Sequence, residues 1–196
     1  DGYNDILIGA HWNNEGGTMA GQTYLILGRS GGLGRNMTLS SAEASFIGEF
    51  TEDHSGYSVS GAGDVNGDGY DDILIGAYGN VEGGTQAGQA YLILGKASGW
   101  SMDNDLANAD ASFIGEASWN ALGEKQGVSG AGDVNGDGYD DFLIGAGLND
   151  EGGANAGQVY LFLGKDSGWT MDTDVSKADA SFFGEDAQDG AGLVTG

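Results

Sequence analysis

Short apolar runs bounded by glycine recur along the chain, as in Ile73-Leu74-Ile75 and Tyr91-Leu92-Ile93-Leu94. Short apolar runs between turn-forming stretches predict β-strands. In the middle of the chain we expect strands at 57–65, 72–77, 89–94 and 112–115, and a helical turn within 102–109. The apolar runs are continuous rather than alternating, so these strands should be buried on both faces, as in a sheet stacked between two others.

The same pattern occurs three times in one register. Segment 1–10 returns at 68–77 and 137–146, segment 20–28 at 87–95 and 156–164, and segment 44–49 at 111–116 and 180–185. All three landmarks keep offsets of 67 and 69 residues, which chance does not produce. We therefore predict one array of three units over residues 1–196, with repeat landmarks at 1–49, 68–116 and 137–185.

Each unit should form a sheet of four antiparallel strands, because no helix between the runs is long enough for a parallel crossover. Repeated all-β units that stack on one another predict the blades of a β-propeller. Leu33, Trp100 and Trp169 occupy equivalent positions in the three units. We expect these three residues to pack between neighbouring sheets; stacking of a sugar or another ligand on Trp100 and Trp169 is the alternative.

Composition narrows the possible partners. The chain has 40 glycines and no proline, without the Gly-X-Y period of collagen. Its formal charge is −24, from 30 acidic and 6 basic residues, so it lacks the basic patch that nucleic acid or an anionic membrane requires. The absence of cysteine excludes disulfides and thiolate metal sites. No apolar stretch is long enough for insertion across a membrane.

Acidic residues recur at fixed spacing in two loops, 64–72 and 133–141. Positions 1, 3, 5 and 9 carry side-chain oxygens, and position 7 would supply its backbone carbonyl. The candidate ligands are Asp64, Asn66, Asp68, Tyr70 and Asp72 in the first loop and Asp133, Asn135, Asp137, Tyr139 and Asp141 in the second. Gly69 and Gly138 permit the tight turn that points every second residue inward. Hard oxygen donors without His or Cys favour Ca²⁺ over zinc or copper, and Mg²⁺ demands a stricter octahedron, so we predict two full calcium sites.

Neither an EF-hand nor a purely structural turn accounts for these loops as well as a calcium site does. An EF-hand requires a bidentate Glu at position 12, where this chain has Ile75 and Ile144 inside strand-like runs. A purely structural Asp/Asn turn does not require four oxygen-bearing side chains in each of two copies.

The strand, the Asp-x-Asn-x-Asp-Gly-x-x-Asp loop and the following Ile-Leu-Ile-Gly-Ala strand resemble the FG-GAP repeat of integrin alpha-subunit β-propellers and their microbial relatives. The resemblance covers nearly all of the chain and implies one four-stranded blade per repeat, with calcium in a hairpin loop at the rim of the blade. The Phe-Gly element is Phe46-Ile-Gly48, Phe113-Ile-Gly115 and Phe182-Phe-Gly184, and His11, Tyr78 and Gly147 replace the proline of Gly-Ala-Pro. These departures leave the subfamily open and the acidic loops unchanged.

A third loop is divided between the two ends of the chain. Residues 189–196 align with 129–136, and residues 1–5 with 137–141. The reunited loop would contain Leu193, Thr195, Asp1, the Tyr3 carbonyl and Asp5. Because Leu and Thr replace an Asp and an Asn, we expect this degenerate site to bind calcium weakly or not at all. A terminal blade would then be split between 186–196 and 1–10.

Three blades are too few to close a propeller, and an open array leaves exposed sheet edges. We therefore expect two chains to associate head to tail as a homodimer, each end completing a shared blade, in a six-bladed ring with twofold symmetry. The rival hypothesis is a fragment of a longer propeller.

The leading expectation is a calcium-stabilised, non-enzymatic propeller for recognition, adhesion or assembly at the cell surface or outside the cell, with an unknown protein or carbohydrate ligand. Loop 79–88 and its copies form the candidate ligand surface. An alternative is a propeller that is, or is attached to, an extracellular hydrolase. Glu49, Glu52, Asp53 and His54 form the one non-repeated cluster, but no Gly-x-Ser-x-Gly, Walker or His-based metal motif is present. A third hypothesis is a module whose only partners are its own copies.

Overall fold

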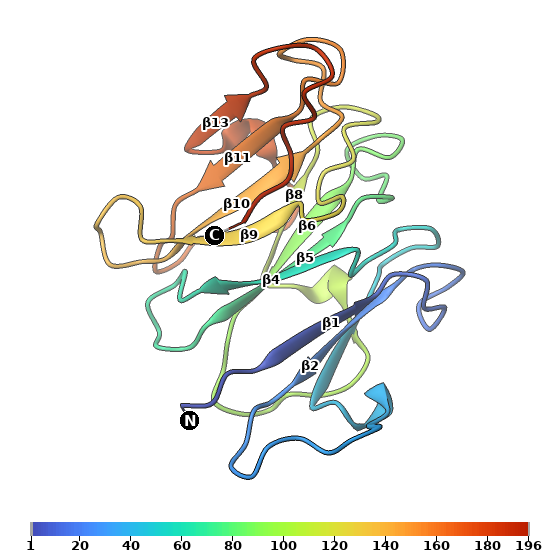
Figure 1. Ribbon diagram of the computed structural model, residues 1–196, viewed down its shortest axis with the longest axis vertical. Coiled ribbons are helices and arrows are strands. Elements are labelled where there is room, and N and C mark those ends of the chain that lie inside the picture. The colour runs from blue at the N-terminus through green and yellow to red at the C-terminus, as the bar shows by residue number, and fades with distance from the viewer. Residues whose placement is uncertain (1, 196) are drawn as a thin grey trace.

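Thirteen β-strands and three single-turn 3-10 helices build residues 2–195, the part of the chain that the computed structural model describes. The strands group into three sheets. In Figure 1 these sheets lie one beside the next, from the N-terminal sheet in blue at the bottom to the C-terminal sheet in red at the top. The prediction of an all-β chain is confirmed.

We call the sheets blades 1, 2 and 3, because antiparallel sheets of this size are consistent with propeller blades. Blade 1 contains β1 (Ile6–Ala10), β2 (Gln22–Ile26) and β3 (Ala44–Ile47). Blade 2 contains β4 (Ser58–Gly63), β5 (Asp72–Ala77), β6 (Gln89–Ile93) and β8 (Ala111–Ile114). Blade 3 contains β9 (Val128–Gly132), β10 (Asp141–Ala146), β11 (Gln158–Phe162) and β13 (Ala180–Phe183).

Within each blade, strands that follow one another in the chain are antiparallel neighbours. Blades 2 and 3 have the four strands that the sequence predicts, and blade 1 has three strands of its own. The strand expected at 72–77 is β5 to the residue, and the other three expected strands differ from β4, β6 and β8 by one or two residues at their ends.

A long connection leads to the last strand of each blade. These connections carry the 3-10 helices η1 (Leu39–Ser41), η2 (Leu106–Asn108) and η3 (Val175–Lys177), and η2 is the helical turn expected within 102–109. Two strands of two residues, β7 (Asn104–Asp105) and β12 (Thr173–Asp174), were not predicted, because so short a segment has no hydrophobic period. β7 pairs parallel to β3, and β12 pairs parallel to β8, so each connection reaches the preceding blade.

The hydrophobic core lies between the blades. One cluster, which includes Phe46 and Ile75, joins blades 1 and 2, and a second, which includes Leu92 and Phe142, joins blades 2 and 3. β5 and β6 are buried along their whole length, as expected for strands covered on both faces. Because the core is divided between two junctions, stability depends on contacts between neighbouring blades.

Trp100 and Trp169 pack against these clusters, as predicted for anchors between sheets. The ring of Trp100 meets Phe46 edge-on at 6.3 Å between centroids, and the Lys96 ammonium lies 4.7 Å from the Trp100 ring centre. Leu33 is 37% exposed, so the prediction of an anchor is wrong for this residue within one chain. The reason is that residues 2–195 contain no sheet on that side of blade 1 against which Leu33 could pack.

Close backbone contacts at glycines set the register from one blade to the next. A Cβ atom on Gly76 would overlap the carbonyl group of Gly123, and the same relation joins Gly9 to Gly56 and Gly145 to Gly192. Gly192 therefore occupies the position equivalent to Gly56 and Gly123, which precede β4 and β9, the first strands of blades 2 and 3.

This register corrects the predicted alignment of residues 189–196 with 129–136. Leu193 and Thr195 follow the position of Gly123 and do not belong to a metal loop. The hydrogen bond from the Ala191 N–H to the Ala156 carbonyl supports the correction, because Leu122 makes the equivalent bond. The Gly-Ala-Gly sequence that occurs in both segments is too short to fix an alignment.

Candidate functional site

Both acidic loops leave the blades at the same end, because each joins the first strand of its blade to the second. They connect β4 to β5 and β9 to β10, and both project on the left side of Figure 1. The pairing is irregular where each loop begins or ends, between Gly61 and Gly63 and between Asp141 and Phe142. A bulge of this kind bends the strand and re-aims the residues beside it.

The first loop turns its side-chain oxygens toward its own backbone. The Asp64 carboxylate accepts hydrogen bonds from the N–H groups of Asp68 (3.0 Å) and Gly69 (2.8 Å). Asn66 Oδ1 accepts from the Asp68 N–H at 2.9 Å, and Asp68 Oδ1 accepts from the Tyr70 N–H at 2.9 Å. The side chains at positions 1, 3 and 5 are thus gathered on the inner side of one turn.

The second loop repeats this arrangement. The Asp133 carboxylate accepts from the N–H groups of Gly136, Asp137 and Gly138 at 2.6, 3.1 and 2.9 Å. These donors, that of Gly138 above all, lower the pKa of Asp133 below its ordinary value. Gly69 and Gly138 have φ of 91° and 96°, so the predicted need for glycine at this turn is confirmed.

Position 9 has a structural role of its own. Asp72 is 1% exposed, and its carboxylate accepts from the N–H groups of Val65 (2.9 Å) and Gly95 (2.6 Å). Asp141 makes the same two contacts, with Val134 at 2.8 Å and Gly164 at 2.8 Å. Burial raises the pKa of Asp72 to about 6 against these hydrogen bonds. Each position-9 carboxylate therefore ties its loop to the end of the third strand of its blade.

The candidate ligand atoms fit calcium in kind and in their order along both loops, since all are carboxylate, amide or carbonyl oxygens. Within residues 2–195, no three acidic or histidine side chains converge as a metal-binding group by themselves. A bound ion would therefore have to draw on the amide oxygen of Asn66 or Asn135 and on the carbonyl of Tyr70 or Tyr139 as well as on the carboxylates. Calcium would supply the positive charge that the three candidate acidic ligands of each loop, at positions 1, 5 and 9, otherwise lack.

The two loops are joined to each other by contacts that the sequence did not reveal. The Asp64 N–H donates to Asp140 Oδ2 at 2.9 Å, and the Asp140 N–H donates to the Asp64 carbonyl at 3.0 Å. The Lys165 N–H donates to the Val65 carbonyl at 2.8 Å. The sequence carries one signal for this contact, an acid directly before position 9 in both loops, Asp71 and Asp140.

The predicted third loop is not assembled within one chain. Asp1 lies outside the described residues; Tyr3 and Asp5 precede β1 in blade 1, whereas the Val194 N–H donates to the Gln126 carbonyl in blade 3. Asp5 accepts from the Gly28 N–H at 2.7 Å, which is the contact that Asp72 makes with Gly95.

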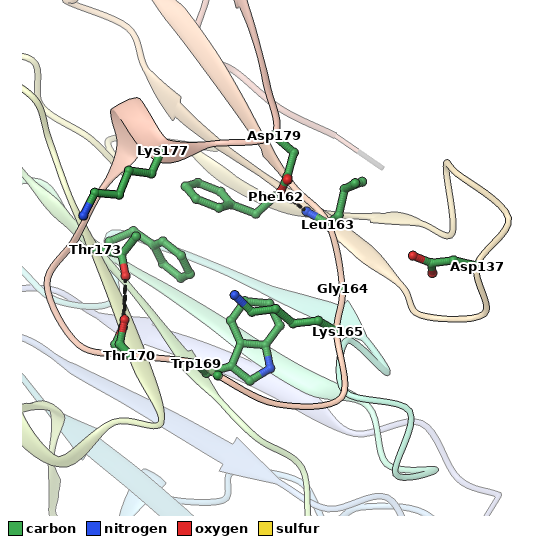
Figure 2. A pocket seen from close by; sticks show the side chains of 12 residues that line it. Asp137, Phe162, Leu163, Gly164, Lys165, Trp169, Thr170, Thr173, Lys177 and Asp179 are labelled. Atoms are coloured by element: carbon green, nitrogen blue, oxygen red, sulfur yellow. Dashed lines mark hydrogen bonds between the residues drawn. The ribbon is translucent and has the colours of Figure 1, made fainter.

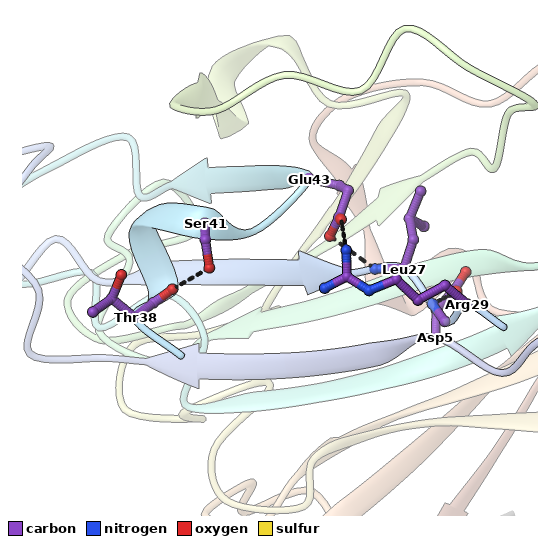
Figure 3. A network of polar contacts seen from close by, with 7 residues as sticks. Asp5, Leu27, Arg29, Thr38, Ser41 and Glu43 are labelled. Carbon is purple, nitrogen blue, oxygen red and sulfur yellow. Dashed lines mark hydrogen bonds and ion pairs between the residues drawn. The ribbon is translucent and has the colours of Figure 1, made fainter. Parts of the chain in front are cut away.

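Figure 3 shows Asp5 beside a polar network in blade 1. Glu43 accepts from the Leu27 N–H at 3.0 Å and pairs with Arg29 at 4.0 Å. Asp110 and Asp179 accept the equivalent bonds in blades 2 and 3, so the acid at this position holds strands together.

The non-repeated cluster considered for hydrolysis has structural roles instead. Asp53 is 1% exposed and accepts from the Phe50 N–H (2.9 Å) and the Asn80 side chain (3.3 Å). Asn120 and Asp189 cap the equivalent turns in the other blades, so this position is repeated after all. Glu49 faces Tyr91 of blade 2, and this contact lowers the pKa of Glu49 against the larger effect of burial.

The environment of these two acids changes their titration. Burial raises the pKa of Glu49 to about 7 and that of Asp53 to about 6. His54 stacks on Tyr78 with ring centroids 5.0 Å apart, and its Nδ1 is buried without a partner among the described residues. Glu52 is exposed and has φ of 69°. Raised carboxyl pKa values occur in active sites, but here burial accounts for them, and the hydrogen bonds of the two carboxyls act in the opposite direction.

A cleft of about 470 Å³ lies at the junction of blades 2 and 3, at the end that carries the acidic loops. Figure 2 shows the Lys165 side chain over the Trp169 ring in this cleft, with Thr170 and Thr173 farther along the same connection. The Lys165 ammonium lies 4.5 Å from the centre of the Trp169 ring, so it covers the face on which a sugar would stack.

A second cleft, of about 460 Å³, opens at the opposite end of the blades, between loops 115–121 and 148–155. Trp119, 58% exposed, lies at this cleft, whose polar lining includes Asn149, Asp150 and Glu151. Sequence reasoning named the loop surface but missed Trp119, because its equivalents Glu52 and Gln188 are polar.

Comparison with known proteins agrees with the resemblance of the sequence to the FG-GAP repeat. The FG-GAP repeat family model matches residues 55–93 and 127–162. The chain is 36% identical over 121 residues to integrin alpha-PS2 of Drosophila melanogaster, which is 59% of this chain and 8% of that protein. It is 36% identical over 96 residues to integrin alpha pat-2 of Caenorhabditis briggsae, which is 49% of this chain and 7% of that protein. It is 38% identical over 79 residues to human integrin alpha-IIb, which is 40% of this chain and 7% of that protein. The chain thus spans less than a tenth of the length of these relatives. Among residues 2–195, no helix is long and apolar enough to cross a membrane.

Proposed function

We propose that this chain, which matches the FG-GAP repeat over residues 55–93 and 127–162 and is similar to integrin alpha subunits, is a calcium-stabilised propeller module for adhesion or recognition outside the cell or at its surface. The observation that carries the proposal is the matched geometry of the two acidic loops. In both, the side chains at positions 1, 3 and 5 gather on one turn while position 9 anchors the loop to its blade.

Calcium has a structural role in this proposal. The Asp64–Asp140 contact joins the first loop to the second, so an ion in either loop would stiffen the same junction. An ion that binds the folded chain alone raises its stability in proportion to the logarithm of the ion concentration over Kd.

The ligand surface that we propose is the end of the blades opposite to the acidic loops. The cleft at Trp119 offers an exposed indole beside amide and carboxylate groups. An indole face with polar neighbours suits the apolar face and hydroxyls of a sugar ring, or a protein side chain with a polar rim. The ligand is therefore a protein or a carbohydrate.

Calorimetric titration with Ca²⁺ tests the metal part of the proposal. The wild type should bind two ions per chain, and the double variant Asp68→Asn/Asp137→Asn should bind none while keeping its fold. A wild type that releases no heat and melts at one temperature in Ca²⁺ and in EDTA would refute the calcium role.

A glycan array and a panel of purified extracellular proteins test the recognition part. Binding should be lost in Trp119→Ala and retained in Trp12→Ala, a still more exposed tryptophan on another loop of the same end. Turnover of a polysaccharide in the same screen would support the hydrolase alternative, which no geometric observation favours.

A further inference from the structure

The peptide bond between Tyr139 and Asp140 lies at the contact of the two acidic loops. Its carbonyl group belongs to Tyr139, at position 7 of the second loop, where the sequence places a backbone ligand for calcium. Its N–H group belongs to Asp140 and donates to the Asp64 carbonyl of the first loop at 3.0 Å. Because a peptide bond is planar, the directions of its carbonyl and its N–H are fixed together. A carbonyl held in the second site therefore also fixes the N–H group that contacts the first loop.

The Asp140 side chain makes a second bond to the same residue. Asp140 Oδ2 accepts from the Asp64 N–H at 2.9 Å, so both backbone polar groups of Asp64 are bonded to one residue of the second loop. Asp64 is position 1 of the first loop, and its carboxylate accepts from the N–H groups of Asp68 and Gly69. The residue that Asp140 holds is thus the candidate ligand around which the first loop folds.

Close packing accompanies these two hydrogen bonds. A Cβ atom on Gly67, in the turn of the first loop, would lie 2.7 Å from Cε1 of the Tyr139 ring. A Cβ atom on Gly63, directly before the first loop, would overlap the Asp140 carboxylate. The first loop therefore lies directly against positions 7 and 8 of the second, and neither loop can change its backbone there without moving the other.

We propose that the two acidic loops bind calcium with positive cooperativity, so that occupancy of either loop raises the affinity of the other. This inference rests on the proposed function, because it requires a calcium site in each loop. When the Tyr139 carbonyl is held in the second site, Asp140 orders Asp64 before the first loop is occupied. The first loop then loses less conformational freedom on binding, which is a sufficient source of coupling. By linkage, the effect of the first loop on the second has the same size.

Repulsion between two bound cations acts in the opposite direction. Each loop has three candidate acidic ligands, so it keeps a net negative charge after one divalent ion is bound. Interactions between exposed charges are also screened over about 8 Å at physiological ionic strength. Direct hydrogen bonds between the loops are not weakened in this way. The positive coupling should therefore prevail at physiological salt and be smaller at low salt.

Calcium titrations of the wild type and of two single-loop variants measure the coupling. Asp68→Asn and Asp137→Asn each disable one loop, so each gives the affinity of the remaining loop alone. With these two affinities fixed, a two-site fit to the wild-type titration should give a coupling factor of about 5 or more, the lower end of the usual range for linked sites. Calorimetry and competition with a chromophoric chelator supply the titrations, at physiological and at low ionic strength.

Two substitutions of Asp140 separate its hydrogen bond from its charge. Asp140→Ala removes the acceptor of the Asp64 N–H, so the coupling factor should fall. Asp140→Asn removes the same charge but keeps an amide oxygen that can accept this bond, so the coupling should be retained. Asp71→Ala is a further control, because Asp71 is the equivalent residue of the first loop, is exposed, and makes no hydrogen bond to the second loop within the described chain. It should leave the coupling factor unchanged.

Amide hydrogen exchange follows the same path while the contact itself stays intact. In Asp68→Asn, Ca²⁺ can occupy only the second loop, yet exchange of the Asp64 N–H in the first loop should become slower, because Asp140 is its hydrogen-bond partner. In Asp137→Asn, Ca²⁺ in the first loop should slow exchange of the Asp140 N–H. Each variant in EDTA supplies the reference rate.

A wild type that binds two ions as independent sites overturns the inference and leaves the structural role of calcium intact. So does a coupling factor that is the same in Asp140→Ala as in the wild type, or exchange of the Asp64 N–H that does not respond to Ca²⁺ in the second loop. A wild type that binds no calcium overturns both this inference and the proposed role of calcium.

Discussion

The backbone N–H of Asp64, the first residue of one acidic loop, donates a hydrogen bond of 2.9 Å to the carboxylate of Asp140 in the other loop. The two loops belong to different blades, so this contact transmits a change in one loop to its neighbour.

Asp140→Ala should weaken the junction of blades 2 and 3, because it leaves the half-buried Asp64 N–H without an acceptor. The expected loss is about 1–3 kcal/mol in the free energy of unfolding, measured by denaturant titration. Asp71→Ala is the control: Asp71 is the equivalent residue of blade 2, is exposed, and its side chain makes no such bond in the described chain. Equal losses in both variants would contradict the role of the bridge.

Positions 5 and 9 of the acidic loops should respond differently to calcium. Asp68→Asn removes a charge from an exposed side chain, so its melting temperature should match the wild type in EDTA and fall below it in Ca²⁺. Asp72→Asn places an amide where two buried N–H groups need acceptors, and it should cost about 1–3 kcal/mol in both conditions. Thermal melts of both variants with and without Ca²⁺ make the comparison. A calcium-dependent loss of equal size in both would count against an anchoring role for Asp72.

Stability should fall as pH rises through the range in which Glu49 and Asp53 lose their protons. Their folded pKa values, about 7 and about 6, lie above the ordinary 4.5 and 3.8, so the folded chain binds more protons than the unfolded chain in between. The free energy of unfolding therefore decreases between about pH 4.5 and 7, and the full loss is present above that range. Burial is the main cause for both groups, and the nearby charges of Asp172, Asp105 and Glu82 act in the same direction.

Glu49→Gln keeps a neutral side chain at all pH values, so its stability should exceed that of the wild type above pH 7 and depend less on pH. Denaturant titrations in EDTA from pH 5 to 8 measure the difference. Glu52→Gln, in an exposed residue nearby, should follow the wild-type curve. A wild-type curve that rises steadily over this range would show that Glu49 does not hold its proton in the folded chain.

The sequence predicted the local parts of this fold. β5 was predicted to the residue because Asp72 closes the acidic loop and the run that begins at Ile73 continues through Gly76 to Ala77. The acidic loops were predicted because their spacing and the positive φ of Gly69 are properties of a few neighbouring residues.

Contacts between blades were not predictable in the same way. Whether Trp100 is covered and Leu33 is not depends on which blade lies beside each, and the repeat makes the two positions look equivalent. Asp53 appeared unique because Asn120, its equivalent, is a different residue with the same capping role. The alignment of the C-terminal residues failed because contacts with blade 3, such as those of Gly145 with Gly192 and of Ala156 with Ala191, set their register.

The contact between Gly76 and Gly123 should tolerate no side chain. Gly76 lies in β5, and a Cβ atom there would overlap the backbone of the segment that leads into blade 3, which cannot move without separating the blades. Gly76→Ala should therefore cost at least about 1–3 kcal/mol, the usual range for overpacking a core. Gly61→Ala is the matched control, because Gly61 also lies in a strand of blade 2 and a Cβ atom there has open space around it. Gly61→Ala should change the unfolding midpoint little.

Because the glycine contact recurs at Gly9 and Gly145, Gly145→Ala should repeat the loss if the contact spaces the blades. Wild-type stability in both Gly76→Ala and Gly145→Ala would instead mean that the blades separate freely at this point.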